Sequence, residues 1–220
     1  MNILEALASI VQVAEALSVA FERVGTLLRQ ARSGIRGLHL APRMTYENVM
    51  LEAVLDICDR QGRKAVVRRK QRIRFLAEDA GLIRELVWGE GNPLADYRVQ
   101  GARCLGFQRE GSKSVILLTL ARRPTKGEEA VISSCRLISH ALTDDNGYAE
   151  MLVERPTRYV ALKVLFPRTR PPREAHLTSQ PPSLSKPSIP IRFGRDGRPY
   201  LIWRYNNPNR FTTYSLRWSW

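Results

Sequence analysis

The chain has 220 residues, of which 44% are hydrophobic and 25% charged, and this is the composition of a folded globular protein rather than a disordered one. Lysine and arginine number 35 against 21 acidic residues, so the formal charge of +14 excludes a chain that is indifferent to polyanions. Three cysteines, Cys58, Cys104 and Cys135, are too few for a disulfide framework and are not spaced as a zinc site. Reduced, dispersed thiols predict a cytoplasmic protein, and we expect no metal and no cofactor.

Residues 1–34 predict one long amphipathic helix, which spans residues 2–32. Asn2 and Glu5 form a capping box at its start, and Gly34 stands where a C-cap glycine is expected. The segment has no basic start and no small-residue cleavage site, so we expect no secretory signal peptide. Apolar residues recur with the alternating four-and-three spacing of a coiled-coil seam, at Ile3, Leu7, Ile10, Ala14, Leu17, Phe21, Val24 and Leu28.

The apolar face of this helix has three possible partners. It can pack on the chain's own domain, join copies into a homo-oligomer, or contact an anionic membrane. Membrane contact is the least favoured, because the opposite face carries Glu5, Glu15 and Glu22 where membrane helices favour Lys and Arg. The residues expected to make the oligomer or membrane contact are Ile3, Leu7, Ile10, Leu17, Phe21, Val24 and Leu28.

After a linker at 33–44, residues 45–220 show the short turn-to-turn spacing of an all-β domain, and we predict a mostly β fold, an antiparallel β-sandwich. Residues 49–58 and 64–76 also fit a helical face, but Gly62 favours a hairpin because the loop needs a left-handed residue. Residues 167–190 hold seven prolines and predict an extended surface segment rather than a paired strand. Further strands are expected at 82–88, 96–99, 103–107, 114–121, 131–142, 148–153, 159–166, 200–205 and 211–220.

Two sets of residues resemble known families. Trp88-Gly89-Glu90-Gly91, together with Phe166-Pro167 and Arg170-Pro171, resembles an uncharacterised bacterial β-rich domain with W-G-[DE]-G and F-P-x-x-R-P motifs. That resemblance covers about residues 70–220 and implies a β-rich fold but no activity. The apolar helix from Ile3 to Leu28 is similar to the leading helices of some defence and cell-death proteins, which implies an effector that assembles or inserts.

No group of residues specifies a catalytic reaction. The histidines stand apart, and His140 and Cys135 would point to opposite faces of one strand. Carboxylate pairs occur at Asp56/Asp59, Glu128/Glu129 and Asp144/Asp145, and the last two are adjacent residues of a kind typical of solvated turns. We therefore predict that the chain is not an enzyme.

The distribution of positive charge is the main indication of function. Residues 60–74 contain eight bases and no acid, and they are the predicted nucleic-acid or polyanion site: Arg60, Arg63, Lys64, Arg68, Arg69, Lys70, Arg72 and Arg74. The last 29 residues add arginines interleaved with aromatic residues, a pattern that suits single-stranded nucleic acid. We predict a binding protein whose partner is nucleic acid or an acidic protein. The alternative is an effector that acts through helix 2–32.

Overall fold

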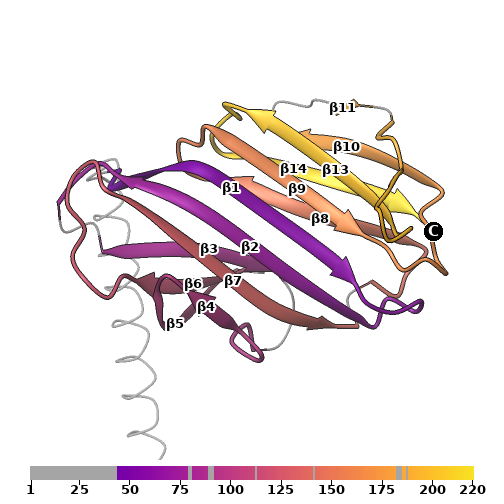
Figure 1. Cartoon of the computed structure of the whole chain (residues 1–220), viewed down its shortest axis with the longest axis horizontal. Helices are drawn as coiled ribbons and strands as arrows, with labels where there is room; N and C mark the ends of the chain where they lie inside the picture. The colour runs from indigo at the N-terminus through magenta and orange to yellow at the C-terminus, as the bar shows by residue number, and fades with distance from the viewer. Residues whose placement is uncertain are drawn as a thin grey trace, which may run out of the picture. The chain divides into compact units, whose positions relative to one another are not determined.

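A computed structural model describes residues 44–78, 81–88, 92–111, 113–140, 142–181, 185–186 and 188–220. The helix predicted over 2–32 lies outside these residues, as do Gly89, Glu90 and Gly91. Met44–Trp220 forms one compact unit that is mostly β, with fourteen strands in three sheets in its described part (Figure 1).

The largest sheet has seven strands. In spatial order they are β12 (Arg192–Phe193), β13 (Pro199–Asn206), β9 (Tyr159–Leu165), β1 (Tyr46–Ile57), β2 (Lys64–Phe75), β7 (Glu129–Ser139) and β4 (Arg98–Gln100). The long hairpin β1–β2 lies at its centre, with Ile57 paired to Ala65 next to the turn. The hairpin predicted from the sequence is confirmed, and Gly62 in its turn has the expected positive φ, 72°.

Two smaller sheets complete the fold. A four-stranded sheet has the order β11 (Ser185–Lys186), β10 (Glu174–Gln180), β14 (Thr212–Ser219) and β8 (Asn146–Val153). A three-stranded sheet has the order β3 (Leu82–Trp88), β6 (Lys113–Thr119) and β5 (Arg103–Glu110). The apolar run predicted to be a central strand is β6, which is the central strand of this sheet.

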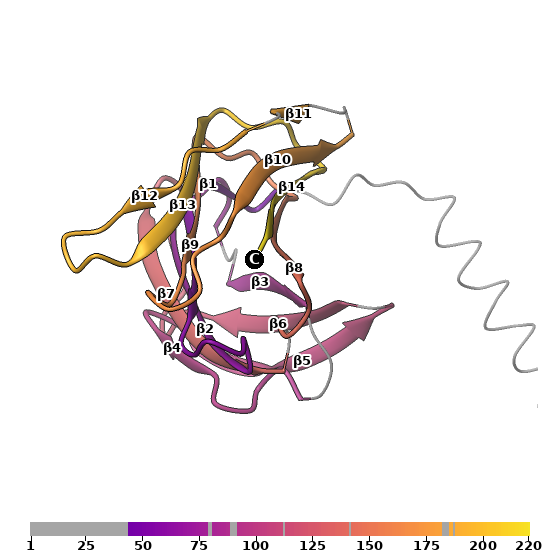
Figure 2. The ribbon, with the colours of Figure 1, turned by 90° about the vertical axis from the view of Figure 1, so that its right-hand side faces the viewer.

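Both smaller sheets pack on the same face of the seven-stranded sheet, because alternate residues of β2 contribute to two separate cores. Ala65 belongs to a core shared with the four-stranded sheet, where Leu216 and Trp218 of β14 are buried. Ile73 and Phe75 belong to a second core, shared with Ile83, Ile116 and other residues of the three-stranded sheet. Figure 2 shows the two smaller sheets as separate groups of strands beside β1, β2 and β7.

Two predictions about the strands are wrong. The fold is not purely antiparallel, because β1 pairs with β9 in parallel, Leu51 opposite Val160. The proline-rich segment 167–190 does contain a paired strand, since β10 lies between β11 and β14. Its seven prolines flank the strand and leave residues 173–180 free of proline, so every amide there can donate to a neighbour.

Candidate functional site

The outer face of β2 carries four of the eight predicted polyanion-binding residues: Arg68, Lys70, Arg72 and Arg74. They alternate with the inward-facing residues of the strand, as the sequence predicts for a strand with one exposed face. Every one of the four faces an acid. Glu52 of β1 lies directly opposite Lys70 in the pairing of β1 with β2. The ion pairs are Arg68–Asp56 at 2.9 Å, Arg72–Glu129 at 3.8 Å, Arg74–Glu129 at 2.6 Å and Arg74–Glu47 at 3.6 Å.

These acids limit what the outer face of β2 can offer to a polyanion. An arginine already paired with a carboxylate must release it, or share it, before a phosphate can bind in the same geometry. The acids come from β1 and β7, the two strands that flank β2, and so the pairing follows directly from the sheet order. We conclude that this face is a mixed-charge surface rather than a continuous cationic one.

The other predicted bases lie elsewhere. Arg69 faces inward, between the sheets. Arg60 and Arg63 are exposed in the β1–β2 turn, and Lys64 is exposed at the start of β2. The eight bases therefore occupy three different environments.

Arg60 and Arg63 line an open hollow at the turn end of the hairpin. Arg170 and Arg173, from the segment before β10, line the same hollow. We call these four residues the arginine end cluster. The hollow has a volume of about 770 Å³, and Asp145 is the only acid among the described residues that line it. Within the described part of the chain, Arg60, Arg63 and Arg173 form no salt bridge.

Arg170 holds this end of the fold together. Its guanidinium lies over the Trp220 ring, 4.0 Å from the ring centroid. It also donates to the main-chain oxygens of Arg60 at 3.2 Å and Asp144 at 3.4 Å. The β1–β2 turn, the turn before β8 and the C-terminus thus meet at one side chain.

Asp59 fixes the turn that carries Arg60 and Arg63. Its carboxylate accepts hydrogen bonds from the main-chain amides of Gln61, Arg63 and Lys64, at 2.8, 3.1 and 2.7 Å. Burial acts to raise the pKa of the Asp59 carboxyl, but these amide donors outweigh it, so the pKa is lowered and the group stays ionised. The Asp59 carboxylate therefore holds the turn in place through these three main-chain hydrogen bonds.

Three of the other carboxylates singled out as candidate acid–base groups, Asp56, Glu128 and Glu129, have structural partners. Asp56 binds Arg68 and Arg198, and Glu129 binds Arg74. Glu128 accepts from the Thr125 amide at 3.1 Å, and this bond, with Arg122, lowers its pKa. No three His, Cys, Asp or Glu side chains of the described residues are grouped so that they could hold a metal ion.

Three of the eight aromatic residues in the last 29 residues are part of the core, whereas Phe193, Tyr205 and Phe211 are exposed. Trp203, Tyr214 and Trp218 are buried, and Trp203 stacks on Tyr214 with ring centroids 4.4 Å apart. They are therefore not available as a stacking surface for bases. Trp220, beside Arg170, is the aromatic residue that the fold brings to the arginine end cluster.

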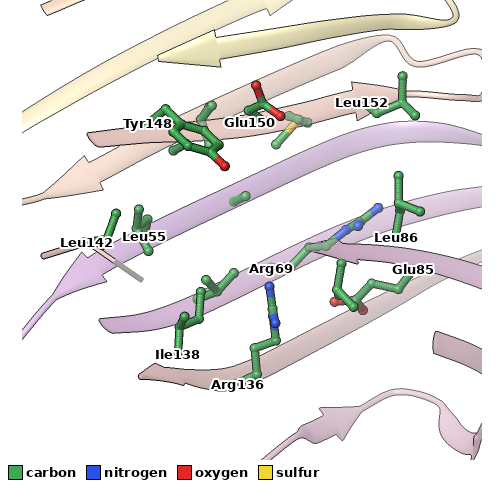
Figure 3. A pocket seen from close by; sticks show the side chains of 16 residues that line it. Leu55, Arg69, Glu85, Leu86, Arg136, Ile138, Leu142, Tyr148, Glu150 and Leu152 are labelled. Carbon is green, nitrogen blue, oxygen red and sulfur yellow. The ribbon is translucent and has the colours of Figure 1, made fainter. Parts of the chain in front are cut away.

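A separate cavity of about 200 Å³ lies over the centre of the seven-stranded sheet, where the two smaller sheets part (Figure 3). We call it the inter-sheet cavity. Its walls come from β8 and β3, which are edge strands of the two smaller sheets, and its floor comes from β1, β2 and β7. Arg69 and Arg136 extend toward it from neighbouring strands (Figure 3).

The sequence could identify only part of these sites. Arg170 and Arg173 stand in a segment that was predicted as a surface wrap, with nothing to place them beside residue 60. Arg136 lies in a strand whose alternation, with Ile132 and Ser134 on the same face, was the available sign that it points inward. The alternation of residues does not give the order of the strands in the sheet, and both sites depend on that order.

No protein-family model matches the chain, and no curated protein does. The solved structures that it matches include a "putative protease" from Parabacteroides distasonis, at 10% identity and a TM-score of 0.53, with 80% of this chain covering 40% of that one. They also include an M1 zinc metallopeptidase from Deinococcus radiodurans, at 12% identity and a TM-score of 0.42, with 78% of this chain covering 42% of that one.

The chain thus spans about two fifths of the length of these solved structures. At 10% identity the likeness to the first protein shows a shared fold and nothing about activity. Within the described residues no helix is long and apolar enough to cross a membrane.

Proposed function

We propose that this chain is a non-enzymatic binding domain that holds a polyanion, single-stranded nucleic acid, against the arginine end cluster. One observation carries the proposal: two segments far apart in the sequence bring Arg60, Arg63, Arg170 and Arg173 around one hollow. Residues 60–74 were predicted as the binding surface, and the proposal keeps the turn end of that run. It does not depend on the outer face of β2.

The absence of ion pairs in the cluster supports this choice over the strand. Arg60, Arg63 and Arg173 are exposed and form no salt bridge to a described residue. Their guanidinium groups can therefore bind a phosphate without losing an acid partner. Arg68, Arg72 and Arg74 would first have to give up Asp56 or Glu129.

The four arginines divide into contact and positioning residues. Arg60, Arg63 and Arg173 can each contact one phosphate through two parallel N–H donors. Arg170, held against Trp220 and bonded to the Arg60 carbonyl, positions the turn that carries Arg60 and Arg63. A single strand suits the hollow better than a duplex, because its backbone bends to follow three charges set on loops.

The test is binding of a fluorescein-labelled 15-nucleotide oligo-dT to the full chain, measured by anisotropy over a range of salt concentrations. We expect a dissociation constant on the order of 10⁻⁵ M near physiological salt and tighter binding below it. Three phosphate contacts to a single strand give a slope of about −2 for log K against log salt. The variant R60E/R63E/R173E should lose at least tenfold in affinity, and its slope should approach zero.

The matched control is R192E/R204E/R210E, which changes the net charge by the same amount at three exposed arginines outside the hollow. It should bind within about threefold of the unmodified chain. Equal losses in the two variants would show that only net charge matters, and this would overturn the assignment to the arginine end cluster. Failure of the unmodified chain to bind at low salt would overturn the function itself.

Action through helix 2–32 stays a prediction, with an anionic membrane or a second copy of the chain as its partner. The residues concerned lie outside the described part of the structure. An acidic protein partner also stays a prediction, and it would compete with the oligonucleotide for the same arginines.

A further inference from the structure

We propose that the inter-sheet cavity is a second binding site, which takes a small amphipathic carboxylate: an apolar body of medium length with one carboxylate group. This site is independent of the arginine end cluster. It lies between the sheets, and none of the cluster's arginines lines it.

The size of the cavity sets the size of the ligand. Its volume is about 200 Å³. An engineered cavity of about 150 Å³ holds benzene, which has six non-hydrogen atoms, so in proportion this one has room for roughly eight. The eight carbons of an eight-carbon carboxylate match that number, and its two oxygens belong at the polar end.

The apolar side chains that line the cavity define the apolar part of the ligand. Leu55, Val67, Leu86, Ile138 and Leu162 line the cavity, and they come from β1, β2, β3, β7 and β9. Binding transfers an apolar chain from water to a preformed apolar surface, and this transfer is favourable. The two small residues Ala53 and Ala149 also line it and leave space where larger side chains would fill the gap.

Arg69 defines the polar end. Its Nε is buried without a hydrogen-bond partner, and its guanidinium forms no salt bridge among the described residues. A buried donor without an acceptor is unfavourable, and an ionised carboxylate is the acceptor that best matches a guanidinium. The pairing of β2 with β7 places Ser134 opposite Arg69 and Arg136 opposite Val67, so two guanidinium groups share this part of the floor as diagonal neighbours.

The carboxylates of the cavity already have hydrogen-bond donors. Glu85, which is buried, accepts from Ser134 at 2.8 Å and from Tyr97 at 3.0 Å. Glu150 accepts from Ser215 at 2.8 Å. Both carboxylates thus already have at least one donor, whereas the Arg69 Nε has no acceptor, and this asymmetry favours an anion over a cation as the ligand.

The experiment is calorimetric titration of the full chain with octanoate, and with octylammonium as a probe of equal length and opposite charge. We expect octanoate to bind at one site per chain and octylammonium not to bind. Arg69→Met should weaken octanoate binding at least tenfold. Arg72→Met is the matched control: it removes the same charge from the same strand on the opposite face, and it should bind within about twofold of the unmodified chain.

A second variant covers the case in which Arg69→Met does not fold. Ala53→Leu places a larger side chain on the cavity floor and should abolish octanoate binding while leaving oligo-dT binding unchanged. The inference is overturned if octanoate does not bind, if octylammonium binds equally well, or if octanoate binding survives Ala53→Leu. Oligo-dT binding serves as the second readout throughout, so failure of this site and failure of the arginine end cluster are distinguishable.

Discussion

Asp56 connects the end of β1 to β2 and to the residue that precedes β13, through two ion pairs. Its side chain is 13% exposed and binds Arg68 at 2.9 Å and Arg198 at 2.7 Å. Arg198 also donates to the carbonyls of Phe166 and Ile57, so Asp56 orients a guanidinium that links three segments. Burial acts to raise the pKa of Asp56, but the hydrogen bonds and charges of Arg68 and Arg198 outweigh it, and the pKa is lowered.

The lowered pKa of Asp56 predicts how stability depends on pH. Because the unfolded carboxyl has an ordinary pKa of 3.8, the contribution of Asp56 is complete above that value and is lost as the pH falls through the lower pKa of the folded state. Asp56→Asn should lower the free energy of unfolding at pH 7 by about 1–3 kcal/mol. Between pH 5 and pH 2 the variant should lose less stability than the unmodified chain. Urea unfolding at several pH values measures both.

Asp144→Asn is the control for this prediction, because Asp144 is an exposed turn residue without a salt bridge to a described residue. Its unfolding curves should follow those of the unmodified chain at each pH. Parallel pH dependences for Asp56→Asn and the unmodified chain would contradict the role given to Asp56.

Gly62 is required by two separate features of the β1–β2 turn. Its φ is 72°, and a Cβ there would lie 1.9 Å from the Leu142 carbonyl oxygen. Gly127 has a similar φ of 85°, with nothing within 4 Å of the position of a Cβ. Gly127→Ala should therefore cost only the left-handed backbone energy, about 1–2 kcal/mol. Gly62→Ala should cost at least about 2 kcal/mol more, because the Leu142 segment must also move.

Thermal or urea unfolding of the two glycine variants compares these costs directly. Equal destabilisation would show that the contact with Leu142 adds nothing. Because Arg60 and Arg63 lie on either side of Gly62, Gly62→Ala should also weaken oligo-dT binding if the variant folds.

At the scale of the elements, β14 determines whether the four-stranded sheet exists. It lies between β10 and β8, and it buries Tyr214, Leu216 and Trp218. Burial of three such side chains is worth roughly 5–9 kcal/mol, which is comparable with the whole stability of a domain. Deletion of residues 211–220 should therefore abolish cooperative unfolding, as followed by circular dichroism during heating. Arg217→Ser, on the exposed face of the same strand, should melt as the unmodified chain does; a cooperative transition in the truncated chain would contradict the prediction.

Strand positions were predictable from the sequence where a local pattern decides them. The hairpin, the central apolar strand β6 and the alternating strand β14 all follow from periodicity and from turn residues. Strand β10 was missed because proline content was averaged over 167–190, although the prolines lie only at its two sides. Averaging hides a short strand that is free of proline.

The arrangement of sheets was not predictable in the same way. Period-two alternation shows which residues of β2 point inward, but it does not show that Ala65 and Phe75 enter different cores. The division of one sheet face between two smaller sheets depends on contacts between segments far apart in the chain. The candidate sites depend on it too: the inter-sheet cavity exists because the covering layer is divided, and the acids beside Arg68 and Arg74 follow from the strands that flank β2.

At the scale of the whole described unit, the central strand of the large sheet is a mixed-charge surface rather than a basic one. Acids on β1 and β7 pair with the arginines on the outer face of β2, whereas Arg60, Arg63 and Arg173, which form no salt bridge to a described residue, meet at the turn end of the hairpin. The net charge of the sequence therefore indicates the chemistry of a partner but not the place where it binds.

The parallel pairing of β1 with β9 affects how the chain is made. Strand β1 leaves the ribosome before β9, because Val160 follows its partner Leu51 by roughly a hundred residues. At about 5–20 residues per second, the open side of β1 waits several seconds for its neighbour. During that interval an incomplete chain presents an unpaired strand edge beside the β1–β2 hairpin, and β9 must arrive before that edge is closed.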